Sequence, residues 1–149
     1  MRDIKTAASQ IFAKQSTIYR MSLNTKSFIS DQAKEFRKSF QVNNSTKPAS
    51  RTGQKNLIVE EFKEFLEADQ QLLLDYKRNS SECLKELADV VYVCYQYAEN
   101  LGWDLDEALN RVHQSNMTKL GKNGQPILRE DGKVLKGPNY QPPVLTDLV

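Results

Sequence analysis

Four carboxylates alternate with core-forming side chains in residues 56–68, NLIVEEFKEFLEA. They are Glu60, Glu61, Glu64 and Glu67. On a helix, side chains three positions apart have Cβ atoms about 5–6 Å apart, so Glu61 and Glu64 are expected to form a pair beside the apolar stripe. Taken alone, a Glu-x-x-Glu pair is usually a solvated helix face, so a second acidic group must support any interpretation as a site.

That second group is Glu86 and Asp89, within KELADVVYV at 85–93. Val93 and Tyr97 project on the same side of the expected helix one and two turns later, and a broad apolar face lies on the other side. A helix that is apolar on both sides is typical of burial. Glu86 and Asp89 are therefore expected to lie along a stripe that continues as core.

Carboxylates gathered from two adjacent antiparallel helices would repel one another if they were buried without partners. Mg²⁺ relieves this repulsion because it takes oxygen ligands, commonly a few carboxylates with water and substrate phosphates. The pattern predicts a site for Mg²⁺, with Mn²⁺ as a substitute, in which the metal in turn holds phosphate. The competing interpretation is a non-catalytic helical oligomerisation or interaction module, whose acids only decorate the surface.

Two other metal chemistries are excluded by the histidine count. His113 is the only histidine and no Cys-x-x-Cys is present, which argues against zinc. A di-iron carboxylate bundle needs Glu-x-x-His pairs, and no glutamate stands three positions before His113.

The composition is that of an ordinary water-soluble domain, and the chain of 149 residues is long enough for one core. A net charge of +2 is too small to indicate nucleic acid or membrane as the main partner. No apolar run approaches the ~20 residues of a membrane span, and the N-terminus lacks a signal-peptide core. Cys83 and Cys94 lie roughly 16 Å apart on one expected helix, too far for a disulfide. We expect a cytoplasmic protein, in the host cytoplasm if it is viral.

The fold class expected is all-α: an antiparallel bundle of four to five helices with a short C-terminal β-hairpin and an extended tail. Helices are expected over 4–22, 31–42 (with Ser30 as N-cap), 55–77, from the Asn79–Glu82 capping pattern to Leu101, and 105–119. Residues 43–54 are expected to be a loop because of their Asn, Ser, Pro and Gly content.

Two features mark the ends of the later helices. Gly102 is expected to stop the third long helix, and Asp104 with Glu107 repeats the capping pattern for the next one. The hairpin is expected around Asp131-Gly132, between Ile127–Arg129 and Lys133–Leu135, with the tail at 136–143.

The order EEFKE at 60–64, then ELAD at 86–89, resembles the signature of the all-α nucleoside triphosphate pyrophosphohydrolases. These include MazG, phosphoribosyl-ATP pyrophosphohydrolase and dimeric dUTPase. DQAKEFRKSF resembles the first helix of short MazG-like proteins, and residues 112–145 resemble the C-terminal segment of bacterial and phage members. The resemblance covers roughly 28–145. It divides the chain into an N-terminal extension, 1–27, and a MazG-like domain, 28–149.

The resemblance implies hydrolysis of a nucleoside triphosphate to monophosphate and pyrophosphate. The metal ligands that it implies are Glu61, Glu64, Glu86 and Asp89. Glu60 would orient or deprotonate the attacking water, with Glu61 beside it, or serve a further metal. The resemblance also implies a homo-oligomer, a tetramer built as a dimer of dimers or a dimer. It favours purine deoxynucleotides, with dGTP first.

A leaving pyrophosphate needs cationic partners, for which Lys119, Lys136 and Arg129 are the candidates. The glycine after Lys136 is expected to let the backbone approach a phosphate. By family position, Asn116, Gln32 and Phe36 are expected at the nucleotide. Tyr140 is expected either to close the site or to pack the tail down.

Overall fold

The computed structural model describes residues 28–149, so the helix expected over 4–22 lies outside the described residues. Within them the chain forms four helices and no strand, which confirms the all-α class. They are α2 (Ile29–Ser39), α3 (Pro48–Leu72), α4 (Tyr76–Leu101) and α5 (Leu105–Met117).

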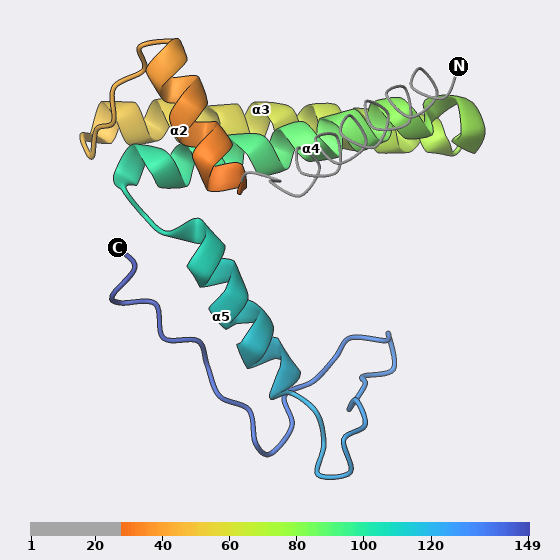
Figure 1. The fold of residues 1–149 in the computed structure, drawn as a ribbon. Helices are drawn as coiled ribbons and strands as arrows, with labels where there is room; N and C mark the ends of the chain where they lie inside the picture. The colour runs from red at the N-terminus through yellow and green to blue at the C-terminus, as the bar shows by residue number, and fades with distance from the viewer. Residues whose placement is uncertain (1–27) are drawn as a thin grey trace, which may run out of the picture.

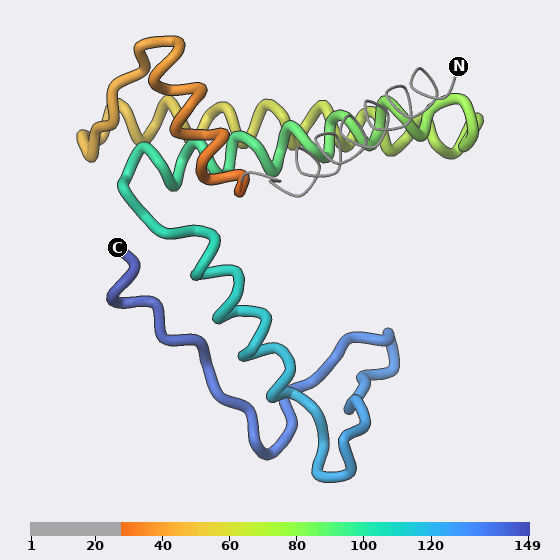
Figure 2. Tube along the Cα trace, viewed as in Figure 1, coloured from red at the N-terminus to blue at the C-terminus, as the bar shows by residue number. Residues whose placement is uncertain are grey.

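The two long helices form the centre of the molecule. α3 and α4 run antiparallel and side by side along their lengths, and α2 crosses α4 near its C-terminal half (Figure 1). α5 turns away from this pair, and the chain after it forms loops at the far end before returning along α5 (Figure 2). The acids of α3 and α4 therefore face each other across one long interface, while the C-terminal segment lies outside it.

The expected β-hairpin is wrong. Among residues 28–149 the turn at Asp131-Gly132 carries a single isolated antiparallel bridge, between Leu128 and Val134. Gly132 has the positive φ of 82° that the turn requires. A ladder does not extend from it because a two-stranded ribbon needs a surface to pack on, and Leu128 and Val134 are 55% and 47% exposed.

The expected loop at 43–54 is also wrong in its second half, because α3 begins at Pro48. Proline is well suited to a first helical turn, where its missing N–H would have no partner. The Asn and Ser content indicated irregular structure correctly only at 43–47, while Ser50 and Gly53 lie within α3.

Helix capping decides the remaining boundaries. α4 begins at Tyr76 because the Asp75 carboxylate accepts from the Arg78 N–H at 3.1 Å. This cap lies four residues before the one expected at Asn79. Gly102, with φ 75°, ends α4 as expected. Asp104 caps α5 by accepting from the Glu107 N–H at 3.0 Å, as expected.

A buried polar network fixes α2 on α4. Arg37 is 4% exposed and donates to the side-chain oxygen of Asn100 at 2.8 Å. Asn100 is 1% exposed, donates to the Ser45 carbonyl at 2.8 Å and accepts from the Ser50 hydroxyl at 3.1 Å. Burial lowers the pKa of Arg37 below its usual value. One arginine and one asparagine thus join α2, the loop before α3, the start of α3 and the end of α4.

Asp106 joins α5 to the other helices. It accepts from the Tyr95 hydroxyl at 2.8 Å and from the Ser30 hydroxyl. Ser30 therefore bonds across helices, and the residue that precedes α2 as its N-cap is Phe28. Burial, followed by the bond to Asp106, raises the pKa of Tyr95 to about 12.

The C-terminal segment is held on α5 by both side-chain and backbone contacts. Arg111 donates to both carboxylate oxygens of Asp147, at 2.6 and 2.8 Å, and the Ser115 hydroxyl donates to the Gln141 carbonyl. Gly137 is buried and donates its N–H to the Lys119 carbonyl at 2.9 Å. The close backbone approach expected of this glycine is therefore to the end of α5.

We predict that Gly137→Ala loosens this seat. A Cβ there would lie 2.4 Å from the Leu120 carbonyl oxygen and 2.6 Å from that of Lys119, so backbone must move. The expected cost is about 1–3 kcal/mol. It is measured by urea unfolding and by the rate of proteolysis within the C-terminal segment. Gly53→Ala is the matched control, because nothing lies within 4 Å of that Cβ and the helix is expected to gain stability. Equal proteolysis of both variants would contradict the prediction.

Candidate metal centre

Three of the four predicted ligands meet between the long helices. Glu61 on α3 and Glu86 and Asp89 on α4 each offer a carboxylate oxygen, and these atoms all lie within 4.8 Å of one another. Glu86 is buried, while Glu61 and Asp89 are half-buried. The antiparallel packing makes this meeting possible because Glu86 and Asp89, three positions apart, share the face of α4 that α3 covers.

Glu64, the fourth predicted ligand, lies one turn beyond Glu61 at the edge of the group. It is exposed, yet among the surrounding charges its carboxylate contributes most to raising the pKa of Glu61. Glu60 is also exposed and raises the pKa of Glu61 least of the four acids around it. Glu60 and Glu64 together line an open hollow of about 590 Å³ on the outer side of α3.

The pKa values of Glu61 and Glu86 are shifted in opposite directions. Burial, and then the charges of the surrounding carboxylates, raise the pKa of Glu61 above its usual value. The ammonium of Lys85 lowers the pKa of Glu86, to which it donates a hydrogen bond of 2.7 Å, and it also lies 3.3 Å from Asp89. The cluster therefore carries an excess of negative charge that one lysine partly offsets.

The residues present fit a hard divalent cation. Within the described chain, the Glu86 Oε2 atom is buried and has no hydrogen-bond partner. An unpaired buried carboxylate oxygen is costly, and a bound cation would remove that cost. The donors are all carboxylate oxygens, which suit Mg²⁺ or Mn²⁺ better than a softer metal.

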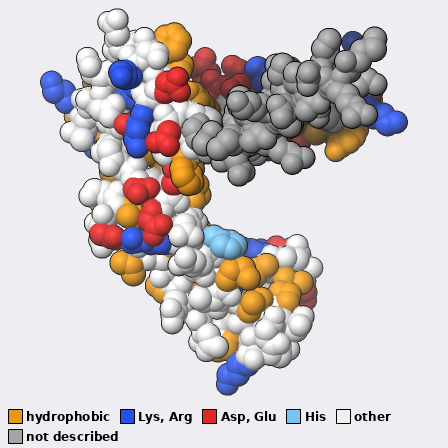
Figure 3. Space-filling model, in the orientation of Figure 1, with side chains coloured by type: hydrophobic (Ala, Val, Ile, Leu, Met, Phe, Trp, Pro, Cys, Tyr) orange, Lys and Arg blue, Asp and Glu red, His pale blue; other side chains and the backbone are white. Residues whose placement is uncertain are grey.

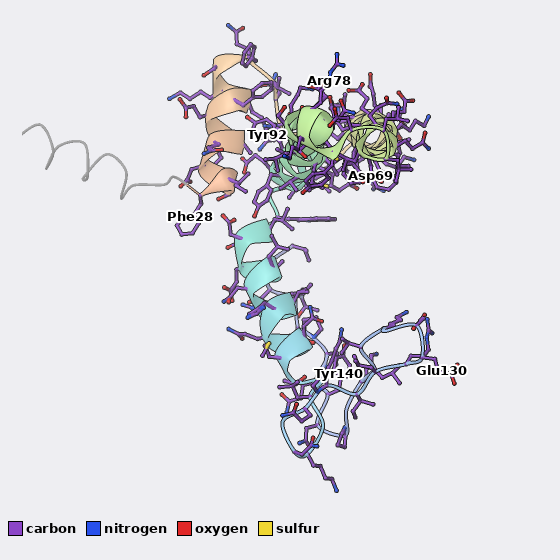
Figure 4. All side chains as sticks on the ribbon, turned by 90° about the vertical axis from the view of Figure 1, so that its right-hand side faces the viewer. Phe28, Asp69, Arg78, Tyr92, Glu130 and Tyr140 are labelled. Carbon is purple, nitrogen blue, oxygen red and sulfur yellow. The ribbon has the colours of Figure 1, made fainter. Side chains whose placement is uncertain are left out.

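An aromatic group joins α2 to α4. Phe36 on α2 stacks on Phe40 with ring centroids 4.5 Å apart, and its ring meets Tyr92 edge-on at 5.9 Å. Tyr92 follows Asp89 by three positions on α4 and points toward α2 in Figure 4. Gln32, exposed on α2, precedes Phe36 by about one turn. The structure thus brings the expected nucleotide residues of α2 to α4.

Tyr92 and Lys85 were missed by sequence reasoning. Tyr92 was identifiable, because a residue three positions after Asp89 shares its face of the helix. Lys85 carried a weaker signal, since adjacent helical positions do not normally face each other.

The phosphate-binding candidates, and the nucleotide-binding candidates Asn116 and Tyr140, are not brought to the acids within one chain. Asn116, Lys119, Arg129, Lys136 and Tyr140 all lie at or beyond the end of α5 that is far from α3 and α4 (Figures 1 and 4). Lys136 lies over the ring of Tyr140, 4.4 Å from its centroid, and Arg129 pairs with Asp131 in its own turn. Tyr140 therefore packs within the C-terminal segment.

A separate acidic hollow of about 660 Å³ lies where α2, α4 and α5 meet. Figure 3 shows acidic side chains gathered near this junction, and the lining acids are Glu99, Asp104, Asp106 and Glu107. Asp104 and Asp106 already cap α5 and join the helices, so we assign this hollow a structural origin.

The region that holds the central cluster matches a known protein family. The model of the phosphoribosyl-ATP pyrophosphohydrolase family matches residues 25–116, which hold the three clustered carboxylates and Glu64. The chain belongs to this family. It is therefore a member of the MazG-like nucleoside triphosphate pyrophosphohydrolase superfamily, as the acidic signature indicated. The matched region ends at Asn116, before most of the C-terminal segment.

A relative is found in a giant virus. An uncharacterized protein of Acanthamoeba polyphaga mimivirus is 33% identical over 98 residues, which cover 56% of this chain and 37% of the viral protein. The chain thus spans well under half the length of that relative. None of the described helices is both long and apolar enough to cross a membrane.

We predict that Glu61→Gln stabilises the metal-free protein near neutral pH, by on the order of a few degrees in Tm. Burial and the neighbouring carboxylates raise the pKa of Glu61 above its usual value in the folded chain, so its charged form opposes folding. The gain should grow as pH rises through the folded pKa and vanish below the unfolded one. Thermal unfolding in EDTA across pH measures it, and a lower Tm for the variant at neutral pH would contradict it.

Proposed function

We propose that this protein is a Mg²⁺-dependent nucleoside triphosphate pyrophosphohydrolase, with Mn²⁺ as a substitute. The observation that carries the proposal is the meeting of Glu61, Glu86 and Asp89 between α3 and α4, with one buried oxygen of Glu86 unpaired. Family membership supplies the reaction class. The bond cleaved would join the α- and β-phosphates, giving a monophosphate and pyrophosphate.

The acids of the cluster would have two roles, metal binding and activation of the attacking water. Glu61, Glu86 and Asp89 would hold the metal, with Glu64 at its edge. When bound, the metal would polarise the phosphates and offset their charge. Glu60 and Glu61 are the candidates to orient and deprotonate the attacking water, and the raised pKa of Glu61 brings it nearer to a useful base.

Phe36 and Tyr92 would bind the base. Their rings meet edge-on where α2 packs on α4, and Tyr92 follows the proposed ligand Asp89 by three positions. Stacking on them would accept different bases, and Gln32 on α2 would read a base edge. We infer purine deoxynucleotides as the substrates, with dGTP first, because the C-terminal segment resembles phage members of the superfamily. Hydrolysis of these nucleotides would control the composition of the nucleotide pool.

Nucleic acid and membrane are not proposed as partners, since the net charge is only +2. Cys83 and Cys94 are free thiols, which agrees with a reducing cytoplasm, that of the host if the protein is viral.

We predict that the purified protein converts at least one of the eight common nucleoside triphosphates to monophosphate and pyrophosphate in Mg²⁺. Activity should disappear with EDTA and fall at least a hundredfold in Asp89→Ala, because a ligand is lost. Chromatography of the products is the measurement. Diphosphate with orthophosphate would overturn the cleavage position. No turnover, with no effect of metal on stability, would favour the non-catalytic module.

We also infer a homo-oligomer, a dimer of dimers or a dimer. Large apolar side chains on both long helices remain exposed, among them Phe62 at 47%, Leu84 at 67% and Leu87 at 43%. Patches of this kind usually mark an interface. The segment after α5, which carries Lys119 and Lys136, lies away from α3 and α4 (Figure 1), so we infer that these lysines would serve the acids of a second copy.

A mixing experiment tests this sharing. Glu86→Gln and Lys136→Ala proteins should each be inactive or nearly so, and together regain about a quarter of wild-type activity if sites are shared pairwise. The control is the variant that carries both substitutions in one chain, which has no partner able to restore a site and should stay inactive. Light scattering that shows a monomer at micromolar concentration, or no recovery on mixing, would contradict the prediction.

A further inference from the structure

Lys85 is the cation held by the acidic cluster in the described part of the chain. Its ammonium nitrogen lies 2.7 Å from Glu86 Oε1 and 3.3 Å from Asp89 Oδ2, so it contacts two of the three clustered carboxylates at once. The Lys85 side chain is 56% exposed, while that of Glu86 is 8% exposed. The exposed Lys85 ammonium is therefore bound to the buried Glu86 carboxylate.

The two oxygens of Glu86 have different environments. Oε1 accepts the hydrogen bond from Lys85, whereas Oε2 is buried and has no partner among residues 28–149. A divalent ion between Glu61, Glu86 and Asp89 would use the same carboxylates as the ammonium, since the three ligand atoms lie within 4.8 Å. Two cations held so close repel each other, and that repulsion opposes metal binding.

We propose that Lys85 is a displaceable counter-cation of the metal centre. It offsets the charge of Glu86 and Asp89 while the ion is absent and competes with the ion for both. The inference rests on the proposed function, because it takes the cluster to be a metal centre. Lys85 can yield because its ammonium ends a flexible four-carbon stem that reaches solvent. The lysine thereby lowers the affinity for the ion and stabilises the empty site.

A role in orienting Glu86 alone makes the opposite forecast. A side chain that hydrogen-bonds to a metal ligand and fixes its orientation raises metal affinity, and its removal weakens binding. A counter-cation opposes the metal, and its removal tightens binding. The direction of the change in Kd therefore separates the two roles.

The experiment is a titration of the metal-free full chain with Mn²⁺, followed by calorimetry. Lys85→Met should lower the Kd for Mn²⁺ by on the order of three- to tenfold, since surface screening limits the effect. Its Tm in EDTA should fall, by about a few degrees. Lys85→Gln should repeat both changes, and Lys85→Arg should keep the Kd near wild type because the charge remains.

Lys77→Met is the matched control. Lys77 is exposed on the same helix, about two and a half turns before Glu86, so its loss changes the net charge equally without touching the cluster. An unchanged or higher Kd in Lys85→Met would overturn the inference while leaving the metal centre standing. A wild-type protein that binds no Mn²⁺ would overturn both the centre and the inference.

Discussion

Mutual repulsion among carboxylates is the constraint around which this molecule is arranged. The antiparallel pairing of α3 and α4 buries apolar side chains, yet it also brings Glu61 against Glu86 and Asp89. Burial and neighbouring charge raise the pKa of Glu61, while Lys85 lowers that of Glu86. A metal-free fold with this interface stores unfavourable electrostatic energy, which a divalent cation would release. Stability and function therefore oppose each other at these positions.

A second polar group works in the opposite sense. Arg37 and Asn100 are buried, but their hydrogen bonds are satisfied across α2, α3 and α4. The network holds α2 against α4, which in turn places Phe36 beside Tyr92. The contact between Phe36 and Tyr92 thus depends on Arg37, the residue after Phe36, whose side chain bonds to Asn100 and not to the clustered acids.

α5 and the segment after it are held by a separate set of contacts. α5 is tied to the rest through Asp106, and the segment after it is held on α5 by Arg111 and by the close backbone seat of Gly137. The segment carries Lys119 and Lys136, and it lies away from α3 and α4, which carry the clustered acids (Figure 2). Under the proposed function, one chain would present the lysines and the acids of a phosphate site separately, and large apolar side chains on α3 and α4 are exposed.

The sequence by itself determined the helical class and the two acidic pairs. It also determined the end of α4 at Gly102 and the start of α5 at Asp104, because capping and helical spacing are local. It misplaced the start of α3 and extended one bridge at Leu128 into a hairpin, since both depended on what the segment packs against. Only the tertiary structure decided that Glu61 meets Glu86 and Asp89 while Glu64 stays at the edge. Distances between helices arise from packing, which no local pattern encodes.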